Sequence, residues 1–519
     1  MTMNNSDNTL SSVRLSSHTV ILPIIKANNE TDSKHRLLFN GLYMAFDVVP
    51  ADVADALSNG STALENTVLK RLLRRGHLTA MSEEGEIGEL KFITRLKRLL
   101  DKKHFYAEII PTYSCNFRCP YCFESRRLKN GEEWLSKRIS PELLDAYFKV
   151  LMKYRERGIK IEQLNLYGGE PLLKENHDLI ENICRRCKEL DIPVETITNG
   201  YDIDHYIDLI DKYHWRDIQI SIDGYGELTD KLRRHKDGNA TYEKIMQNVK
   251  LLYDHNIKTS LRVMTDRKRL SGLGRVAEDI RRRGLEEKAG LFGYYVTSVV
   301  SADKDIMVSP MEIYEQLVSS GMTEDQARSH VLQLRRAWSA VRINMNMKSL
   351  IPVFPYRCRA HNSQRLSVDP YGKVFTCFRA VGEPDASVGI INTENARFEP
   401  NVNALLWDQR DVGTLKKCRT CAFAMFCGGG CSERAKAVKG NYFAEECGQT
   451  KEIYSYILPR AVGKLWHKGM SEELSLSWAE FISKIPAKEK EQFMQAASLA
   501  QQQKIIKDCN WADLFGGFV

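Results

Sequence analysis

The segment Cys115-Asn116-Phe117-Arg118-Cys119-Pro120-Tyr121-Cys122 decides the fold, and it places three cysteines at the spacing C-x3-C-x2-C. It follows the apolar run 106–112, which predicts a buried strand, so the cysteines are expected on the loop that leaves this strand. Three thiolates leave a four-iron cluster one ligand short, and soft thiolate ligands suit iron–sulfur chemistry. Three free or zinc-binding cysteines are the alternative interpretation of the same spacing.

These residues resemble the signature of radical S-adenosylmethionine (SAM) enzymes, in which an aromatic residue precedes the last cysteine. The resemblance implies that Cys115, Cys119 and Cys122 hold a 4Fe–4S cluster, whose open iron chelates the amino and carboxylate groups of SAM. One electron from the cluster would cleave SAM to methionine and a 5′-deoxyadenosyl radical, which abstracts a hydrogen atom from the substrate. Tyr121 is implied to lie near the adenine.

Strands and helices are expected to alternate after this point. The expected strands are 106–112, 161–167, 193–198, 216–222, 257–265 and 289–297, and the expected helices between them are 140–157, 174–190, 202–213, 241–255 and 270–284. This alternation predicts an α/β fold with a parallel sheet and outer helices. Six strands predict a partial (βα)6 TIM-like barrel, which the resemblance also implies. Active sites of such sheets lie at the carboxyl ends of the strands.

Polar motifs follow the ends of successive expected strands. They are Gly168-Gly169-Glu170-Pro171, Thr198-Asn199-Gly200, Ser221-Ile222-Asp223-Gly224 and, just beyond, Arg233. Each motif alone is typical of a turn, but their order after the cysteines argues for one site. By the resemblance, Gly168, Gly169 and Glu170 hold the SAM amino group, and Ser221 and Arg233 meet its carboxylate. Thr198 and Asn199 suit the ribose, and Arg262 is a further candidate.

A second group of cysteines occupies about 90 residues near the C-terminal end. Its seven members are Cys358, Cys377, Cys418, Cys421, Cys427, Cys431 and Cys447. The glycines at 428–430 let the chain wrap tightly between two of these cysteines and expose N–H groups that can bond cluster sulfurs. One or two structural zinc sites with four thiolate ligands each are the alternative interpretation.

This pattern closely resembles the SPASM extension of radical SAM enzymes, which carries two auxiliary iron–sulfur clusters. The resemblance implies that the first auxiliary cluster is bound by Cys358, Cys377 and Cys431. It implies that the second is bound by Cys418, Cys421, Cys427 and Cys447. The first cluster then has an open iron or a ligand other than cysteine. Cys184, Cys187 and Cys509 are not expected to be ligands.

The predicted domains follow from these segments. They are a disordered N-terminus (1–16), a winged-helix-like peptide-recognition domain (17–102), a radical SAM partial barrel (103–310), a helical linker (311–350), a SPASM domain (351–460) and a helical tail (461–519). The N-terminal domain is predicted from a hairpin around Asn40-Gly41 that three helices follow. A strand edge near Leu37–Phe39 or His18–Ile24 is expected to capture a leader peptide by strand addition. A purely structural extension is the alternative.

Composition limits the class of protein. Of the 519 residues, 43% are hydrophobic and 27% are charged, which is typical of a globular protein. The sequence contains no run of 18 apolar residues, so no membrane span is predicted. Residues 1–17 lack an apolar signal region, so we expect a cytoplasmic protein, in which 13 cysteines favour metal ligands over disulfides. The net charge of +8 is spread over helices, so no nucleic-acid partner is expected.

The predicted function is a radical SAM/SPASM enzyme that modifies a side chain of a ribosomally made peptide or protein, by crosslinking or oxidation. The expected partners are a precursor peptide with a leader and an electron donor such as flavodoxin or ferredoxin. Anaerobic sulfatase-maturating enzymes, which make formylglycine, are an alternative, but they place an acidic proton acceptor where this chain has Phe378. Glu383 or Asp385 could substitute. A zinc-dependent nucleic-acid-binding protein is the alternative from another class.

Overall fold

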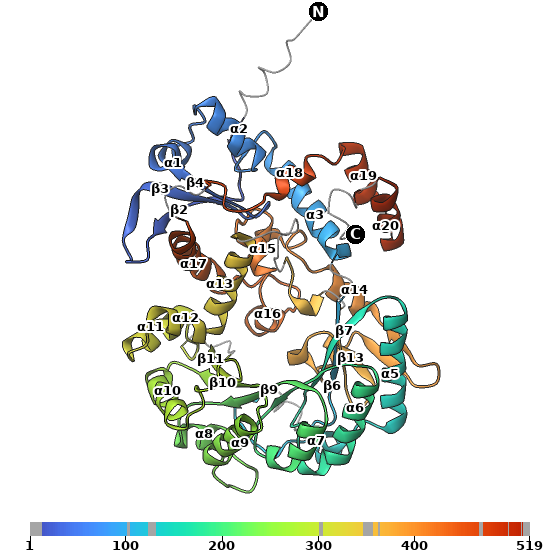
Figure 1. Ribbon diagram of the computed structural model, residues 1–519. Coiled ribbons are helices and arrows are strands. Elements are labelled where there is room, and N and C mark those ends of the chain that lie inside the picture. The colour runs from blue at the N-terminus through green and yellow to red at the C-terminus, as the bar shows by residue number, and fades with distance from the viewer. Residues whose placement is uncertain are drawn as a thin grey trace, which may run out of the picture.

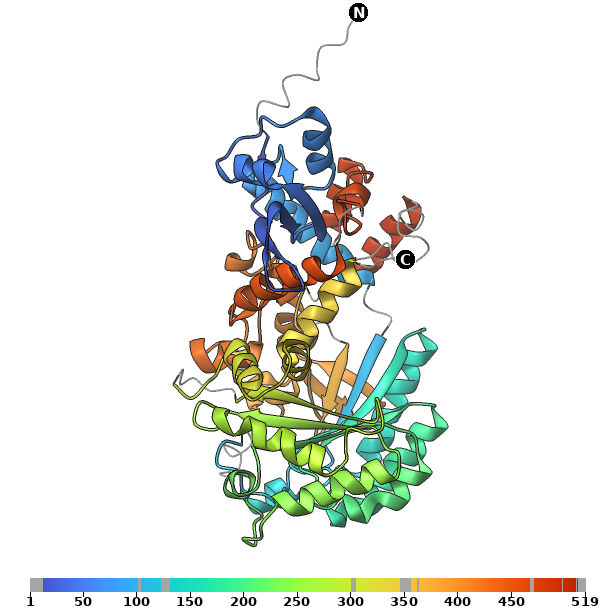
Figure 2. The same ribbon diagram turned by 60° about the vertical axis from the view of Figure 1, so that its left-hand side comes forward.

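The computed structural model describes residues 13–100, 104–122, 131–299, 305–345, 356–361, 364–466, 471–496, 498–509 and 511. A small N-terminal sheet lies at one end of the molecule and a large sheet with outer helices at the other (Figure 1). The cysteine-rich segment, coloured orange, lies between them in both views (Figure 2). Within the described residues, no helix is long and apolar enough to cross a membrane.

The large sheet begins with six parallel strands, as the sequence predicts. They are β6 (His104–Ile109), β7 (Lys160–Leu166), β8 (Val194–Thr198), β9 (Trp215–Ile222), β10 (Thr259–Thr265) and β11 (Phe292–Ser298). These strands are neighbours in chain order, from β6 to β11. Their inward-facing side chains, such as Leu164, Ile220 and Val263, are fully buried. The prediction of a partial TIM-like barrel is therefore confirmed.

Helices cover the outer side of these strands (Figure 1). They are α5 (Pro141–Glu156), α6 (His177–Glu189), α7 (Ile207–Lys212), α8 (Glu227–Leu232), α9 (Tyr242–Asp254) and α10 (Leu273–Arg282). The short helix α4 (Glu132–Ser136) lies instead beside Tyr113, on which its Trp134 stacks. The sequence at the start of α5 shows why this helix begins at Pro141. The Ser140 hydroxyl caps the first turn by accepting from Leu143 N–H, and proline suits the first helical position.

Four more strands extend the same sheet. They are β12 (Arg365–Val368), β13 (Lys373–Phe375), β14 (Gly389–Asn392) and β15 (Arg397–Pro400). The turn residues 369–373 predict a hairpin of short strands, which is confirmed by the first two, whereas the other two strands and the pairing with the barrel were not predicted. Strand β12 pairs in parallel with β6, and β13 to β15 continue antiparallel. The buried Glu108 carboxylate joins the two parts, because it accepts from Ser367 Oγ at 2.6 Å and from Asn165 Nδ2 at 2.9 Å. The cysteine-rich segment thus shares a sheet with the barrel.

Helices connect and follow this sheet. They are α11 (Pro310–Ser319), α12 (Glu324–His330), α13 (Leu332–Met345), α14 (Val402–Gln409), α15 (Ala424–Cys427), α16 (Ser432–Lys439) and α17 (Thr450–Leu465). The first three lie within the segment expected as a helical linker, of which residues 346–350 are outside the described part. They pack on β11, and α13 also packs on α17. The segment is therefore an integral part of the fold.

The N-terminal domain has the expected order of strands and then helices. Its elements are β1 (Arg14–Leu15), β2 (Thr19–Ile25), β3 (Thr31–Asn40), β4 (Ala45–Pro50), α1 (Ala51–Ser58), α2 (Asn66–Arg74), β5 (Leu78–Thr79) and α3 (Glu83–Leu100). The predicted hairpin is confirmed as β3 and β4, although its turn is longer than two residues. The Asn40 side chain holds this turn by accepting from Tyr43 N–H at 2.9 Å and donating to the Gly76 carbonyl at 2.7 Å.

Two expectations for this domain are wrong. Disorder was expected through residue 16, but Arg14 and Leu15 pair with β5, and the Arg14 guanidinium forms an ion pair with the buried Glu86 at 2.7 Å. Leu37–Phe39 was expected at a strand edge, but it lies in β3, the central strand, which pairs with β2 on one side and β4 on the other. Only β2 of the two expected docking strands lies at an edge of the sheet.

The opposite edge, β4, is covered by the C-terminal tail, which the sequence predicted to be helical. The helices α18 (Trp478–Ile482), α19 (Ala487–Gln495) and α20 (Leu499–Asp508) are present. Before them, an extended segment pairs with β4: Val48 N–H donates to the Glu472 carbonyl and Leu474 N–H to the Phe46 carbonyl, both at 2.8 Å. The buried Arg75 guanidinium also donates to the Ser475 carbonyl at 2.7 Å. The tail therefore closes this sheet edge.

Candidate active site and cysteine groups

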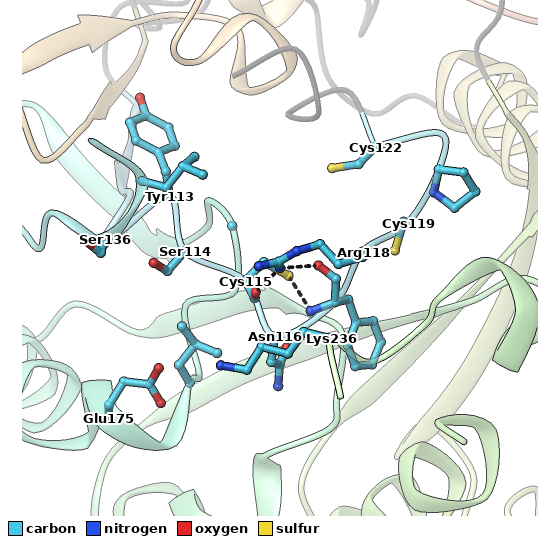
Figure 3. Close-up of a pocket in the computed structure, with 15 residues that line it drawn as sticks. Tyr113, Ser114, Cys115, Asn116, Arg118, Cys119, Cys122, Ser136, Glu175 and Lys236 are labelled. Atoms are coloured by element: carbon cyan, nitrogen blue, oxygen red, sulfur yellow. Dashed lines mark hydrogen bonds between the residues drawn. The ribbon is translucent and has the colours of Figure 1, made fainter. Parts of the chain in front are cut away.

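The three cysteines of the first motif lie on the loop that follows β6, as predicted (Figure 3). Cys115, Cys119 and Cys122 all line a cavity of about 420 Å³. Burial raises the pKa of the Cys115 thiol well above its usual range, and it also raises that of Cys119. The Cys115 sulfur accepts from Phe117 N–H at 3.3 Å. The loop thus presents three thiols toward one space.

The glycine motif after β7 packs directly on this cysteine loop. A Cβ atom on Gly168 would lie 2.7 Å from the Thr112 carbonyl oxygen, and Gly168 has a φ of +131°. A Cβ atom on Gly169 would lie 2.2 Å from the Ser114 carbonyl oxygen. Glu170 N–H donates to that same Ser114 oxygen at 2.8 Å. Only glycine permits this approach, so the motif and the cysteine loop fix each other in place.

Glu170 links this motif to the end of β8. Its buried carboxylate accepts from Thr198 Oγ1 and from Asn199 N–H, both at 2.6 Å, and from Leu172 N–H at 2.9 Å. Burial raises the pKa of Glu170 to about 7, although these hydrogen bonds oppose the shift. The side-chain amide nitrogen of Asn199 (Nδ2) lies 4.0 Å from the Cys115 sulfur. The predicted residues of the first three motifs are therefore brought together.

The residues after β9 form a charged group around Asp223, which was not among the predicted site residues. The fully buried Asp223 carboxylate forms ion pairs at 2.6 Å with Arg233 and with Arg269, and it accepts a hydrogen bond from the Tyr121 hydroxyl. Ser221 lies nearby at the end of β9, in the wall of the second cavity described next. Asp223 thus positions Tyr121 and Arg233, and its place in the motif Ser221-Ile222-Asp223-Gly224 was the signal for it.

A second cavity, of about 480 Å³, contains all the residues predicted to contact SAM. Its lining includes the cysteine loop, the glycine motif, Thr198, Asn199, Ser221 and Arg233. It also includes Arg262, which was a further candidate, and Phe378, Arg379 and Glu433, which were not predicted as site residues. The last three come from the cysteine-rich segment. Their spacing in the sequence carries no motif, so only the packing of this segment on the barrel reveals them.

The seven C-terminal cysteines gather into two groups with the predicted membership. In the first group, Cys358 and Cys431 are close enough to raise the pKa of Cys377, after the larger effect of burial. In the second group, all four cysteines line one cavity of about 350 Å³. These four are Cys418, Cys421, Cys427 and Cys447. Cys184 and Cys187 are buried in α6 and belong to neither group.

Three consecutive glycines join the two groups. Gly428, Gly429 and Gly430 all have left-handed backbone conformations, with φ of +68°, +81° and +79°. A Cβ atom on Gly430 would lie 1.8 Å from the Glu446 carbonyl oxygen. The chain can therefore pass from Cys427 in the second group to Cys431 in the first within four residues.

The donor set of each group fits an iron–sulfur cluster. Each contains three or four thiols, and thiolates are the ligands that such clusters use. Among the described residues, no group of three or more His, Cys, Asp or Glu side chains is arranged to hold a single metal ion. The fit therefore rests on the kind and number of the thiols.

Comparison with known proteins gives a consistent result. A family model described as the radical SAM superfamily matches residues 109–267. The chain is 29% identical over 160 residues to the S-adenosylmethionine-dependent nucleotide dehydratase of Psychrobacter lutiphocae, a match that covers 30% of this chain and about half (53%) of that protein. It is 20% identical over 358 residues to the serine-type anaerobic sulfatase-maturating enzyme of Klebsiella aerogenes, covering 66% of this chain and 83% of that protein.

The fold is similar to that of anSMEcpe, solved with bound AdoMet, with a TM-score of 0.52 at 18% identity, over 69% of this chain and 94% of that one. A structure of anSMEcpe with AdoMet and the Kp18Cys peptide gives a TM-score of 0.50 at 17% identity, over 69% of this chain and 98% of that one. These likenesses concern the fold alone. The family match shows that residues 109–267 form a radical SAM domain.

Proposed function

We propose that this enzyme modifies a side chain of a ribosomally made peptide or protein, by forming a crosslink or by oxidation. The observation that carries the proposal is the composition of the larger cavity. The residues suited to SAM line it from the barrel, whereas Phe378, Arg379 and Glu433 line it from the cysteine-rich segment. A substrate side chain that enters this cavity would lie between the SAM site and the first C-terminal cysteine group, which includes Cys377.

The proposed roles of the residues come from the resemblance to radical SAM enzymes and agree with the shared cavity. Cys115, Cys119 and Cys122 would hold a 4Fe–4S cluster, which would supply the electron for reductive cleavage of SAM. Gly168 and Gly169 let the backbone approach SAM, and Glu170 binds its amino group. Tyr121 is placed for the adenine, Thr198 and Asn199 for the ribose, and Ser221 with Arg233 for the carboxylate, because arginine matches a carboxylate bidentately. Asp223 holds Tyr121 and Arg233 in position.

After a hydrogen atom has been abstracted, oxidation of the side chain would release one electron, which a cluster in a C-terminal cysteine group would accept, and one proton. Glu433 is the carboxylate that the cysteine-rich segment contributes to the cavity. Glu383 and Asp385, the acids considered from the sequence, are not among the described residues that line it. Asp385 instead pairs with Lys436 at 3.0 Å on the surface. We therefore assign proton acceptance to Glu433 rather than to either of those residues.

A second candidate function is the oxidation of a cysteine or serine to formylglycine. It is favoured by the match to a sulfatase-maturating enzyme over 83% of that protein. Phe378 argues against it, because its ring lines the cavity where those enzymes are expected to carry an acid. A sulfatase-derived peptide tests it: we expect no formylglycine by mass spectrometry, and more than a trace would reverse the order of the two candidates.

Leader capture is proposed for the N-terminal domain at the edge strand β2, which α17 contacts near Ile25. Among the strands that the structure describes, β2 pairs with β3 alone, and Pro23 lies exposed within it, as is typical of an edge strand. An extended peptide could add to such an edge by backbone hydrogen bonds.

The test of the proposed modification is to purify the protein anaerobically, confirm about twelve irons per chain, and screen candidate precursor peptides for a mass change that requires SAM and dithionite. Stoichiometric zinc without iron would contradict the proposal.

A further inference from the structure

Arg410 occupies the space between the two C-terminal cysteine groups. It follows α14 directly and is 3% exposed. Its Nη2 donates to the Gly429 carbonyl at 2.6 Å and to the Ala444 carbonyl at 2.8 Å, and its Nη1 lies 3.4 Å from the Gly430 carbonyl. Gly429 and Gly430 join the two groups, and Ala444 precedes Cys447 of the second group. The guanidinium therefore holds the backbone of both groups.

The charge of Arg410 faces thiols from both groups. Burial lowers the pKa of its guanidinium, and four thiols oppose this shift: Cys358 and Cys431 of the first group, and Cys418 and Cys427 of the second. In turn, Arg410 opposes the burial-driven rise in the pKa of Cys358 and of Cys418. It is thus close enough to both groups to interact with each electrostatically.

Two further observations show that, among the described residues, Arg410 has no carboxylate counter-charge and its Nε–H has no acceptor. Across the described residues, no carboxylate forms an ion pair with it, whereas the nearby Arg98 pairs with Asp408 and Asp411. Its Nε is buried, and no described residue accepts a hydrogen bond from it. A buried cation without a counter-charge, and a buried N–H without an acceptor, are both costly. Both costs are offset if anionic iron–sulfur clusters occupy the two cysteine groups.

We propose that Arg410 is the shared counter-cation of the two auxiliary clusters and that its Nε–H donates a hydrogen bond to sulfur in one of them. The inference rests on the proposed function, in which both groups hold clusters. The reduced form of a cluster carries one more negative charge than the oxidised form, so a nearby cation and an N–H···S hydrogen bond stabilise reduction. Arg410 therefore raises the reduction potentials of both auxiliary clusters, as partners of the ligands commonly do.

The test measures potentials rather than turnover. In a background with Cys115, Cys119 and Cys122 changed to alanine, only the two C-terminal clusters remain, and reductive titration followed by electron paramagnetic resonance gives their midpoint potentials. We expect Arg410→Gln to lower both potentials, because the charge is lost. Arg410→Lys keeps the positive charge but lacks the planar set of guanidinium N–H donors. It is expected to retain iron, with potentials closer to those of the background protein.

Arg98→Gln is the matched control, because it removes a partly buried arginine beside Asp411 and is expected to leave both potentials unchanged. Unchanged potentials in Arg410→Gln at full iron content would overturn the proposal. Substantial iron loss that is equal in Arg410→Lys and Arg410→Gln would also overturn it, because the hydrogen bonds to the loop would then be the whole effect. A background protein without iron would instead contradict the proposed function itself.

Discussion

The carbonyl oxygen of Ser114 lies 2.2 Å from the position that a Cβ atom on Gly169 would occupy. Glu170 N–H donates to the same oxygen at 2.8 Å, so two predicted motifs share one backbone contact. The cysteine loop and the glycine motif are about 50 residues apart in the sequence, yet neither can move without the other. This contact makes the first prediction a sharp one.

Gly169→Ala is expected to displace the cysteine loop, because the new methyl group meets backbone rather than a flexible side chain. We expect the rate of 5′-deoxyadenosine formation to fall at least about tenfold, or ~1.4 kcal/mol in the barrier. Gly88→Ala is the control: no atom lies within 4 Å of its added methyl, and alanine favours α3 by about 1 kcal/mol. A Gly169→Ala enzyme with the parent rate would show that the contact is dispensable.

Cys427→Ala is expected to separate SAM cleavage from modification of the peptide. Cys427 belongs to the second C-terminal group, which lines a cavity of its own, apart from the one around the cysteine loop. The variant should lose iron and peptide product but retain uncoupled SAM cleavage, measured as 5′-deoxyadenosine by chromatography. Full product formation without this cluster would refute the assignment, and Cys509→Ala, outside both groups, should behave as the parent.

Leu474→Pro is expected to release the tail from the N-terminal sheet. Proline has no N–H to donate to the Phe46 carbonyl, a bond of 2.8 Å in this structure, and the loss costs about 1 kcal/mol. Limited proteolysis should cleave the variant faster near residue 474. Leu474→Ala keeps the N–H and separates this effect from loss of the side chain. Equal cleavage of the proline and alanine variants would mean that the backbone pairing contributes nothing.

His361 is expected to make stability depend on pH. It is fully buried, and its Nδ1 lies 2.7 Å from the Trp407 carbonyl, so the neutral ring donates there and accepts from the Ser432 hydroxyl through Nε2. Burial, with Arg410 nearby, lowers its pKa from 6.5 to about 3. The unfolded chain therefore binds a proton near pH 6.5 that the folded protein does not. The lowered pKa of His361 does not reduce the free energy of unfolding well above pH 6.5. It reduces this free energy by about 2 kcal/mol between pH 7 and pH 5.

Urea unfolding at pH 7 and pH 5 measures this difference. His361→Gln should remove about 2 kcal/mol of the pH dependence, whereas His205→Gln, at an exposed position, should leave it unchanged. An identical pH dependence in His361→Gln and the parent would show that another group is responsible.

The barrel and its cysteines could be predicted because local patterns determine them. Apolar runs alternate with helical periodicity, and the spacing of Cys115, Cys119 and Cys122 is itself a motif. The turn at 369–373 predicts the hairpin of β12 and β13, but β14, β15 and the pairing of β12 with β6 could not be predicted, because these short strands are stabilised by long-range pairing. The Ser367 hydroxyl reaches Glu108 across more than 250 residues of sequence, and no local pattern encodes such a contact.

The unpredicted site residues have the same explanation. Glu433 and Arg379 reach the SAM cavity only because the cysteine-rich segment packs on the barrel, and Arg410 meets both cysteine groups only because the glycine loop folds back on it. Leu37–Phe39 was misplaced at an edge because the hairpin pattern does not say which strand gains a third neighbour.

The most direct test of the account is SAM cleavage by the reconstituted protein and by Cys119→Ala, with dithionite as the electron source. Cys119 lines both cavities beside the glycine motif, and its loss would leave the cluster two cysteine ligands. We predict that the parent forms 5′-deoxyadenosine and methionine in equal amounts and that Cys119→Ala forms neither above background. Cleavage by Cys119→Ala at the parent rate would contradict the assignment of this loop as the cluster site.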